Sequence, residues 1–414
     1  MSERKRPILM PQYMKQFHCI GSACEDSCCV GWRVDIDHDT YKKYQEVRDE
    51  ELAPLLDKNV TRNRSASKSE ASYAKVKLVA DSRCPFLDEE MLCKIQKKYG
   101  EGHLSDVCTT YPRTTHLING VLERSATMSC PEAARRALLN PEPMEFDEEE
   151  EPSAKRNIIK TTIDTHELKL KLKPQKYLWE LRIFTIMVLQ ERKYFLWERL
   201  TIIGMFFAKV RELIEGEKAS EIPELIASYQ RLAEDDSFKK MLQDIPAHNT
   251  LQMVLLKEIA DKRFFDGINS ARFLECFKEF LTGIQYTAES TMEEIGNRYN
   301  QAWQEYYDPF MKEHEYILEN YLVNYVFKNL FPFTGEKALF DAYMMLVLHY
   351  ALIKMSLIGM AAFHKGLTEE LVIRLIQSFA KTVEHNQQFL NKIAELMKKN
   401  SYNTMAWMAI LIKN

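Results

Sequence analysis

Glycine and proline are scarce in this chain: of its 414 residues, 13 are glycine and 14 are proline. The formal net charge is only −4, which gives no electrostatic reason to expect a nucleic-acid partner. Hydrophobic residues make up 46% and charged residues 28%, as is ordinary for a soluble globular protein. Together with 19 methionines and long stretches rich in Leu, Ile, Lys and Glu, these shortages favour a mainly helical protein.

The N-terminal residues lack the features of a secretion signal. The stretch "MSERKRPILMPQYMKQF" is basic, but no apolar run and no small-residue cleavage site follow the charges. We therefore expect a cytoplasmic protein. Residues 342–363 are apolar and long enough to cross a bilayer, but His349 and Lys354 lie near their middle. Inserting an ionised lysine at the middle of a bilayer costs about 3 kcal/mol of free energy. We therefore expect a helix buried between other helices and no membrane partner.

Cysteine is almost absent from the last two thirds of the chain. The exception, Cys276 in "FLECFKEFL", has the spacing of an ordinary buried helix residue. Residues 146–175 begin with a run of carboxylates between prolines, which is typical of a solvated linker. We predict a cysteine-rich metal-binding domain over 1–145, an acidic and polar linker over 146–175, and a helical domain over 176–414.

Hydrophobic periodicity predicts helices throughout the last part. Leu196, Leu200, Ile203, Phe207, Val210 and Ile214 recur at steps of three and four. Similar stretches cover 249–262, 270–284, 288–304, 310–330, 337–363, 367–383 and 385–412. The first part is more irregular, with an alternating strand pattern over 72–80 and a hairpin pattern around Asn119-Gly120. The predicted fold is mainly α: an N-terminal cysteine-rich metal-cluster domain of mixed structure joined to an all-helical C-terminal domain.

Three interpretations of the N-terminal cysteines compete. They could form disulfides, be inert buried thiols or bind metal. Stable disulfides are rare in the reducing compartment that we expect. Buried inert thiols are also unlike this pattern, because these cysteines cluster and several lie beside Gly, Pro, Asp and Ser. Metal ligation is therefore favoured. The candidate metal ligands are Cys19, Cys24, Cys28, Cys29, Cys84, Cys93, Cys108 and Cys130.

The spacing of these cysteines excludes several familiar metal motifs. The paired knuckles of a zinc ribbon and the ferredoxin runs are absent. Cys24 and Cys28 begin the radical-SAM pattern CxxxCxxC, but position 31 is Gly31. Side chains of the adjacent Cys28 and Cys29 would diverge in an extended segment, so a bulky cluster or two separate centres suit the pair better than one small ion. Eight thiols exceed the four that one four-iron cluster needs, so either a second centre exists or some of the thiols are structural, and both possibilities remain open.

Three N-terminal segments and two C-terminal segments resemble the flagellin lysine N-methylase family, part of the wider group of CxxCxxCC-type zinc- or iron-chelating proteins. They are "FHCIGSACEDSCCVGWRVDIDHDTYKKY", "CPFLDEEMLCKIQKKYGEGHLSDVCTTYPR", "SCPEAARRAL", "ENYLVNYVFKNLFPF" and "IQSFAKTVEHNQQFL". The resemblance spans nearly the whole chain, and the combination of C-x4-C-x3-CC with CPFL and TYPR is specific.

The resemblance implies a bacterial enzyme that transfers methyl groups from S-adenosylmethionine to surface lysines of flagellin, or of another protein with exposed lysines. It also implies an iron–sulfur cluster, [4Fe–4S], associated with the cysteine motif. The residues alone do not indicate methyl transfer, because the only GxG, Gly100-Glu101-Gly102, lacks a strand–turn–helix unit and no SET-like motif is present. The alternative is a non-enzymatic iron–sulfur or zinc protein that acts as a redox-sensing interaction module.

Lysine methylation needs a deprotonated amine and walls that suit a cation. The helical domain offers aromatic residues and possible bases, namely Tyr321, Tyr325, Phe327, Tyr343, Tyr350, His349 and His385. The spacing of Tyr321, Tyr325 and Phe331 is more typical of core packing, and His385 is more typical of a helix contact. Arg113 could bind a carboxylate or pair with an acid of its own domain. The catalytic and donor-binding residues stay unassigned from the sequence.

Overall fold

A computed structural model describes residues 4–64, 70–171, 173–265, 267, 270–333 and 339–414. Helix accounts for 61% of the protein and strand for 11%, which confirms the prediction of a mainly helical fold. The chain forms two compact units. The first contains Met1–Ala133 and Phe146–Ile163, and the second contains Ala134–Glu145 and Asp164–Asn414.

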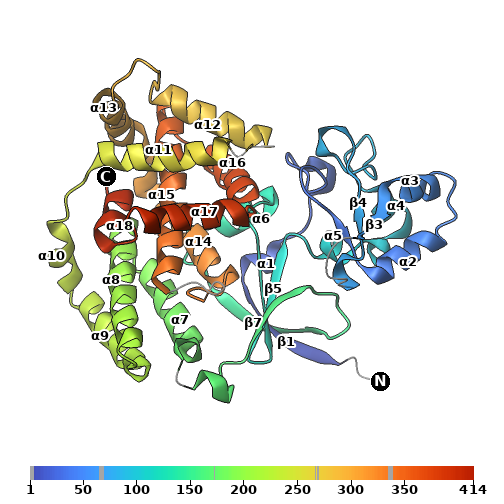
Figure 1. Cartoon of the computed structure of the whole chain (residues 1–414), viewed down its shortest axis with the longest axis horizontal. Coiled ribbons are helices and arrows are strands. Elements are labelled where there is room, and N and C mark those ends of the chain that lie inside the picture. The colour runs from blue at the N-terminus through green and yellow to red at the C-terminus, as the bar shows by residue number, and fades with distance from the viewer. Residues whose placement is uncertain (1–3, 65–69, 172, 266, 268–269, 334–338) are drawn as a thin grey trace. The chain divides into compact units, whose positions relative to one another are not determined.

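A five-stranded sheet with the order β7-β1-β6-β5-β8 lies in the first unit (Figure 1). Its strands are β1 (Lys5–Pro11), β5 (Arg113–Ile118), β6 (Val121–Ala126), β7 (Phe146–Pro152) and β8 (Ile159–Ile163). Strands β5 and β6 form an antiparallel hairpin, and both turn residues, Asn119 and Gly120, have positive φ values of 51° and 82°. This backbone is what an Asn-Gly hairpin turn requires, so the predicted hairpin is confirmed.

Strand β7 corrects the prediction of a linker over 146–175. The acidic segment pairs antiparallel with β1 from Phe146 to Pro152. Residues 146–163 belong to the first unit, whereas 134–145 and 164–175 belong to the second. Glu148, Glu149 and Glu150 are exposed, as a solvated stretch predicts, but they lie on a paired strand. Basic residues neutralise other carboxylates of the run. The buried Glu151 accepts two hydrogen bonds of 2.7 Å from Arg124, and Lys15 pairs with Asp147 at 2.8 Å.

The cysteine-rich region has its own small core. A three-stranded sheet with the order β2-β4-β3 consists of Asp35–Ile36, Ala74–Val76 and Val60–Arg62, so the strand predicted over 72–80 is short. Helices α2 (His38–Glu46), α3 (Leu52–Asn59), α4 (Lys94–Tyr99) and α5 (Asp106–Thr110) belong to the same region, which α1 (Tyr13–Gln16) precedes. The buried residues of this core include Val34, Ile36, Tyr44, Leu52, Leu56, Phe86, Leu87 and Ile95.

The second unit is helical, and α6 (Pro131–Leu138) contains the division between the units. Its further helices are α7 (Leu178–Leu189), α8 (Leu196–Glu215), α9 (Ile222–Glu234), α10 (Ser237–Gln243), α11 (Asn249–Phe265), α12 (Ala271–Gly283), α13 (Met292–Ala302), α14 (Asp308–Lys328), α15 (Leu339–His364), α16 (Glu369–Phe379), α17 (Gln387–Lys399) and α18 (Met405–Ile412). Every helix predicted from the periodicity is present, but the stretch 385–412 is two helices. Residues 337 and 338 of the predicted helix 337–363 lie outside the described residues.

Within the described residues, two π-helical segments interrupt this pattern, at Trp303–Tyr307 before α14 and at Ala380–Glu384 after α16. Sequence periodicity does not reveal them, because each shifts the helical register within a continuous apolar pattern.

The apolar segment 342–363 lies within α15, which occupies the core of the helical unit (Figure 1). This is a helix long and apolar enough to cross a membrane, and 94% of its most apolar 18-residue window is buried inside the protein. Helix α12 crosses it closely, because neither Gly283 nor Gly359 has a side chain at the crossing. A Cβ atom on Gly283 would lie 1.9 Å from the carbonyl oxygen of Gly359.

We expect Gly283→Ala to destabilise the helical unit by about 2–3 kcal/mol. Helix propensity alone would favour alanine by about 1 kcal/mol, but the added methyl forces two backbones apart in a packed core. Urea denaturation followed by circular dichroism measures the change. Gly102→Ala is the control, because a Cβ there meets nothing within 4 Å. A neutral or stabilising Gly283→Ala would contradict the close crossing.

Candidate functional site

Two cysteine segments far apart in the sequence run side by side. The amide of Cys84 donates to the carbonyl of Cys29 at 2.9 Å, and Val30 forms an antiparallel bridge with Arg83. The next cysteine along the chain, Cys93, lies close to the segment that follows Cys84. Cys93 forms an antiparallel bridge with Leu87, three positions after Cys84.

The turn between Leu87 and Cys93 is fixed by an aspartate. One carboxylate oxygen of Asp88 accepts hydrogen bonds from the amides of Glu90 and Leu92, each at 2.9 Å. Cys93 then stands immediately before α4. The sequence "CPFLDEEMLC" is therefore a loop closed on itself, with its two cysteines at the base.

A second aspartate holds Cys108, which lies in α5. The side chain of Asp37 caps α2 through the amide of Thr40 at 2.8 Å and also accepts from the amide of Asp106 at 3.0 Å. Ser105 caps α5 by accepting from the amide of Cys108 at 3.3 Å. These contacts attach α5, and with it Cys108, to the small core.

The thiols near this core influence one another's ionisation. Burial raises the pKa of Cys84 to about 12, and the neighbouring thiols Cys108, Cys93 and Cys28 raise it further. Desolvation by the surrounding chain raises the pKa of Cys108 to about 11, although solvent reaches one side of this residue, and Cys93 and Cys28 again add to it. The pKa of Cys93 is also raised, mainly by burial and then by Cys28. Without a bound metal these thiols are therefore neutral at physiological pH.

A second group of predicted ligands consists of Cys24 and its neighbours Cys19, Cys28 and Cys130. Burial raises the pKa of Cys24, with further contributions from Cys28 and Cys19. Burial raises the pKa of Cys130 to about 12, with contributions from Cys24 and Cys28. Cys28 is thus the cysteine that neighbours both groups.

The remaining cysteines differ from these. Cys29 packs partly buried against the small core. Cys276 is buried in α12 of the helical unit, as its apolar surroundings in the sequence predict. All nine cysteines lie in the described part of the chain, and none of them forms a disulfide there.

No set of three or more His, Cys, Asp or Glu side chains in the described ranges converges closely enough to hold a single metal ion. Seven of the eight predicted ligands therefore fall into two groups of neighbouring thiols that share Cys28, and they do not converge on a common point. Thiolate sulfur is the donor that iron–sulfur clusters take, and such a cluster needs its four sulfurs spaced around it. Metal ligation by these eight residues stays a prediction.

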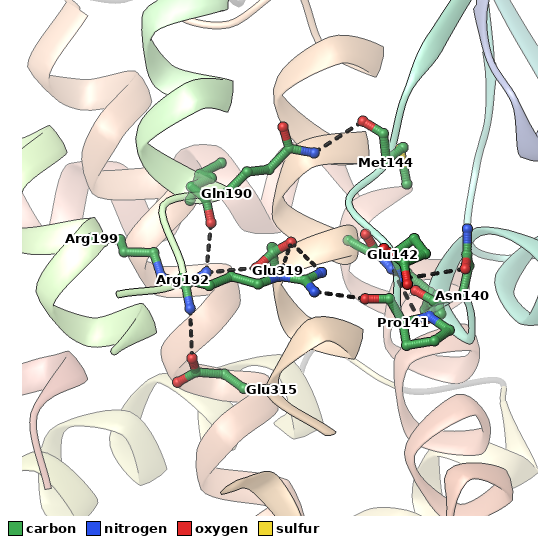
Figure 2. A network of polar contacts seen from close by, with 12 residues as sticks. Asn140, Pro141, Glu142, Met144, Gln190, Arg192, Arg199, Glu315 and Glu319 are labelled. Carbon is green, nitrogen blue, oxygen red and sulfur yellow. Dashed lines mark hydrogen bonds and ion pairs between the residues drawn. The ribbon is translucent and has the colours of Figure 1, made fainter. Parts of the chain in front are cut away.

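The helical unit contains a buried charged network (Figure 2). Arg199 donates to Glu319 at 2.7 Å, to Glu315 at 2.8 Å and to the carbonyls of Tyr194 and Leu189. Side chains of Arg199 and Glu319 are only 3% and 1% exposed. Sequence analysis missed this network. Its signal was present, because Arg199 lies on the apolar face of its helix, three residues after Leu196 and four before Ile203.

The same network fastens the segment 140–144 to the helices. Arg192 pairs with Glu319 at 2.9 Å and donates to the carbonyl of Pro141 at 2.7 Å, as Figure 2 shows. Gln190 donates to the carbonyl of Met144 at 2.9 Å. These bonds explain why residues 134–145 belong to the helical unit.

A second buried carboxylate, Glu384, lies at the end of the π-helix Ala380–Glu384. It accepts from the hydroxyl of Tyr321 and from the ammonium of Lys328, each at 2.7 Å. Burial would raise the pKa of Glu384, but Lys328, with smaller contributions from His349 and Tyr321, lowers it to about 2. An ionised carboxylate beside aromatic rings can bind a cation, and in this structure the bound cation is the ammonium group of Lys328.

The aromatic candidates from the sequence are mostly core residues. Tyr321, Phe327, Tyr343 and Tyr350 are buried, and so is Phe331. The ring of Tyr325 lies 4.9 Å from that of His349, whose Nδ1 is 2.6 Å from the carbonyl of Met345. Thus Tyr321, Tyr325 and His349 gather near Glu384, whereas His385 is exposed.

Two other candidates have local explanations. The guanidinium of Arg113, on β5, lies 5.3 Å from the centre of the Phe17 ring. The segment Gly100-Glu101-Gly102 lies between α4 and α5 and contains a short 3-10 turn, so it lacks the strand–turn–helix surroundings of a phosphate-binding loop.

Comparison with known proteins identifies the class of the chain. Residues 182–411 match the FliB lysine N-methylase C-terminal domain. A lysine-N-methylase of Salmonella typhimurium is 24% identical over 397 residues, covering 92% of each chain, and one of Salmonella choleraesuis is 23% identical with the same coverage. The flagellar biosynthetic protein FliU of Salmonella muenchen is 34% identical over 142 residues, which are 34% of this chain and 82% of that protein. No solved structure matches the chain.

These matches define a protein-lysine N-methyltransferase. The chain belongs to the FliB lysine N-methylase family, which confirms the resemblance seen in the sequence.

Proposed function

We propose that this protein transfers methyl groups from S-adenosylmethionine to the ε-amines of surface lysines of flagellin, that it works in the cytoplasm, and that its N-terminal cysteines hold a [4Fe–4S] cluster. The observation that carries the proposal is the match of residues 182–411 to the lysine N-methylase domain. S-adenosylmethionine is the donor that the resemblance implies, and its sulfonium methyl is activated for attack by an amine.

Flagellin is the proposed substrate because of one relative. A segment of 142 residues is 34% identical to the FliU protein, which is named for flagellar biosynthesis. Another protein with exposed lysines is the competing substrate, since a methylase of this class acts on an amine that many surfaces present.

The reaction sets a clear demand on the chain. A lysine amine has a pKa near 10.4, so at neutral pH it must lose a proton before it can attack the donor. The candidate groups for accepting that proton are His349 and the ionised Glu384, which lie beside the aromatic residues. Tyr321 orients Glu384 by hydrogen bonding, and Lys328 neutralises it.

The cysteines support the cluster and the location. Iron–sulfur ligation requires thiols that are not in disulfides, and here such thiols come from separate segments of the chain between Cys28 and Cys108. Free thiols in this number also suit a reducing compartment. When bound, the cluster would supply a covalent cross-link between loops that are far apart in the sequence.

Co-expression with flagellin tests the transfer. We expect flagellin isolated from cells that contain this protein to gain mass in whole methyl units on lysines, and flagellin from cells without it to gain none. Purified protein should bind S-adenosylmethionine in calorimetry. Absence of both donor binding and methyl gain would contradict the proposal. Methyl gain on a different protein, with none on flagellin, would overturn the substrate only.

A further inference from the structure

Strand β7 lies at one edge of the five-stranded sheet, and among the described residues no other strand pairs with its outer side. All seven of its residues, from Phe146 to Pro152, pair with β1 without a register shift, so the edge is long and regular. The main-chain N–H and C=O groups that point away from β1 are a template for one more strand. The opposite edge strand, β8, has five residues and an irregular pairing with β5, which suits strand addition less well.

The side chains of β7 alternate between two faces of the sheet, and the two faces differ in their balance of charge. On the first face, Lys15 pairs with Asp147 at 2.8 Å and with Glu149 at 2.6 Å. The buried Glu151 lies on the same face and accepts from Arg124 at 2.7 Å. Cations of the chain itself therefore already bind the carboxylates of this face.

The second face of β7 keeps its negative charge. Glu148 and Glu150 are exposed, and no described residue forms an ion pair or hydrogen bond with the side chain of Glu148. Lys5 lies 3.5 Å from Glu150, but the two side chains are 60% and 67% exposed. An exposed pair of this kind contributes little to stability, so both carboxylates are available to a partner.

We propose that the β7 edge, which consists of the outer main-chain side of Phe146–Pro152 and the carboxylates of Glu148 and Glu150, binds an extended, lysine-bearing segment of the protein substrate as an added strand. The inference rests on the proposed function in one respect, that the substrate is a protein that presents lysines. It adds a docking surface outside the methylase match, because residues 182–411 lie in the helical unit and β7 lies in the other unit.

The charge of the β7 edge selects among the possible occupants. A second copy of this chain, paired β7 to β7, would bring two acidic runs together, and like charges on adjacent strands repel each other. A strand with lysines at alternate positions instead places its ammonium groups beside Glu148 and Glu150, since cross-strand neighbours lie about 5 Å apart. Main-chain hydrogen bonds would then supply affinity, and the carboxylates would supply the preference for a basic segment.

Binding of a synthetic peptide to the full-length protein tests the proposal. The probe is a peptide of five Lys-Thr repeats, and calorimetry measures its affinity. A variant with both Glu148→Lys and Glu150→Lys should bind it about tenfold more weakly, because two attractive charges beside the peptide become repulsive. The matched control carries Glu50→Lys and Asp57→Lys, the same change of charge at two exposed positions outside the five-stranded sheet, and should change the affinity by less than about twofold.

Two measurements on the unmutated protein separate strand addition from attraction by charge alone. The same peptide N-methylated at every backbone amide keeps its ammonium groups but has no N–H donors, so we expect it to lose most of its affinity. Hydrogen exchange locates the bound peptide. Binding should slow the exchange of amides within residues 146–152 and leave residues 159–163 of β8 unchanged.

Methyl transfer to flagellin connects the β7 edge with the reaction. The variant with Glu148→Lys and Glu150→Lys should raise KM for flagellin and keep kcat, because docking away from the reacting atoms is equal in the ground state and the transition state. Equal affinity for the N-methylated peptide, no slowing of exchange in residues 146–152, or an unchanged KM would each overturn the proposal. Wild-type protein that binds the peptide on β7 but methylates no flagellin would support the β7 edge and overturn only the proposed substrate.

Discussion

Arg199→Met should lower the free energy of unfolding of the helical unit by about 3–5 kcal/mol. The guanidinium is nearly inaccessible to solvent and donates to Glu319, to Glu315 and to two backbone carbonyls. Removing it takes a buried donor from both carboxylates and from both carbonyls, and leaves Glu319 with Arg192 and Glu315 with the amide of Leu196. Breaking a buried ion pair from one side carries a penalty of this size. Urea denaturation followed by helical circular dichroism measures it.

The matched control is Arg231→Met, which changes an exposed arginine of α9 and should alter stability by less than about 0.5 kcal/mol. The double variant Arg199→Met, Glu319→Leu should recover part of the loss, because it removes both buried charges together. Arg192, which also pairs with Glu319, is 38% exposed and can turn to solvent. A loss under 1 kcal/mol for Arg199→Met would contradict a desolvated network.

The periodicity of apolar residues was sufficient to predict the helices but not what lies between them. Leu196, Leu200 and Ile203 mark a face of α8 because packing requires a repeat of 3.6 residues. Glu319, the partner of Arg199, is 120 residues away in the sequence, so no local pattern pairs them. The acidic stretch of β7 was misassigned for the same reason, since Arg124 and Lys15 neutralise it from distant positions.

The cysteine region shows the same limit in another form. Sequence alone marked all eight thiols as candidates, because residue type and clustering carry that information. Which thiols are neighbours depends on the carboxylates of Asp37 and Asp88, whose hydrogen bonds to backbone amides position Cys108 and Cys93. An aspartate that caps a helix and one that binds metal look alike in a sequence, so the grouping emerged only from the fold.

Lys354 should make the stability of the helical unit depend on pH between about 7 and 10. It lies in α15, and its ammonium donates to the carbonyl of Ile412 at 2.9 Å. Burial lowers its pKa to about 7, against the smaller opposing effects of Glu315 and Asp308. In the unfolded chain its pKa is near 10.4.

The direction of the pH effect follows from proton binding. Between the two pKa values the unfolded state holds a proton that the folded state lacks, so the free energy of unfolding rises as the pH rises. The cost of the buried charge is fully present below pH 7 and is relieved towards pH 10. Over that range the gain is on the order of 4 kcal/mol, at about 1.4 kcal/mol per pH unit.

Comparing wild-type protein with Lys354→Met isolates this contribution from other titrating groups. The difference in free energy of unfolding between the two should favour the variant at pH 6 and decline steadily to pH 10, because only the wild type gains stability from losing that proton. Lys399→Met removes an exposed lysine of α17 and should give a difference that does not change with pH. If the Lys354→Met difference were also constant from pH 6 to 10, the ammonium would keep its charge inside the protein over that range, and the carboxylates of Glu315 and Asp308 would offset the effect of burial on its pKa, contrary to the prediction.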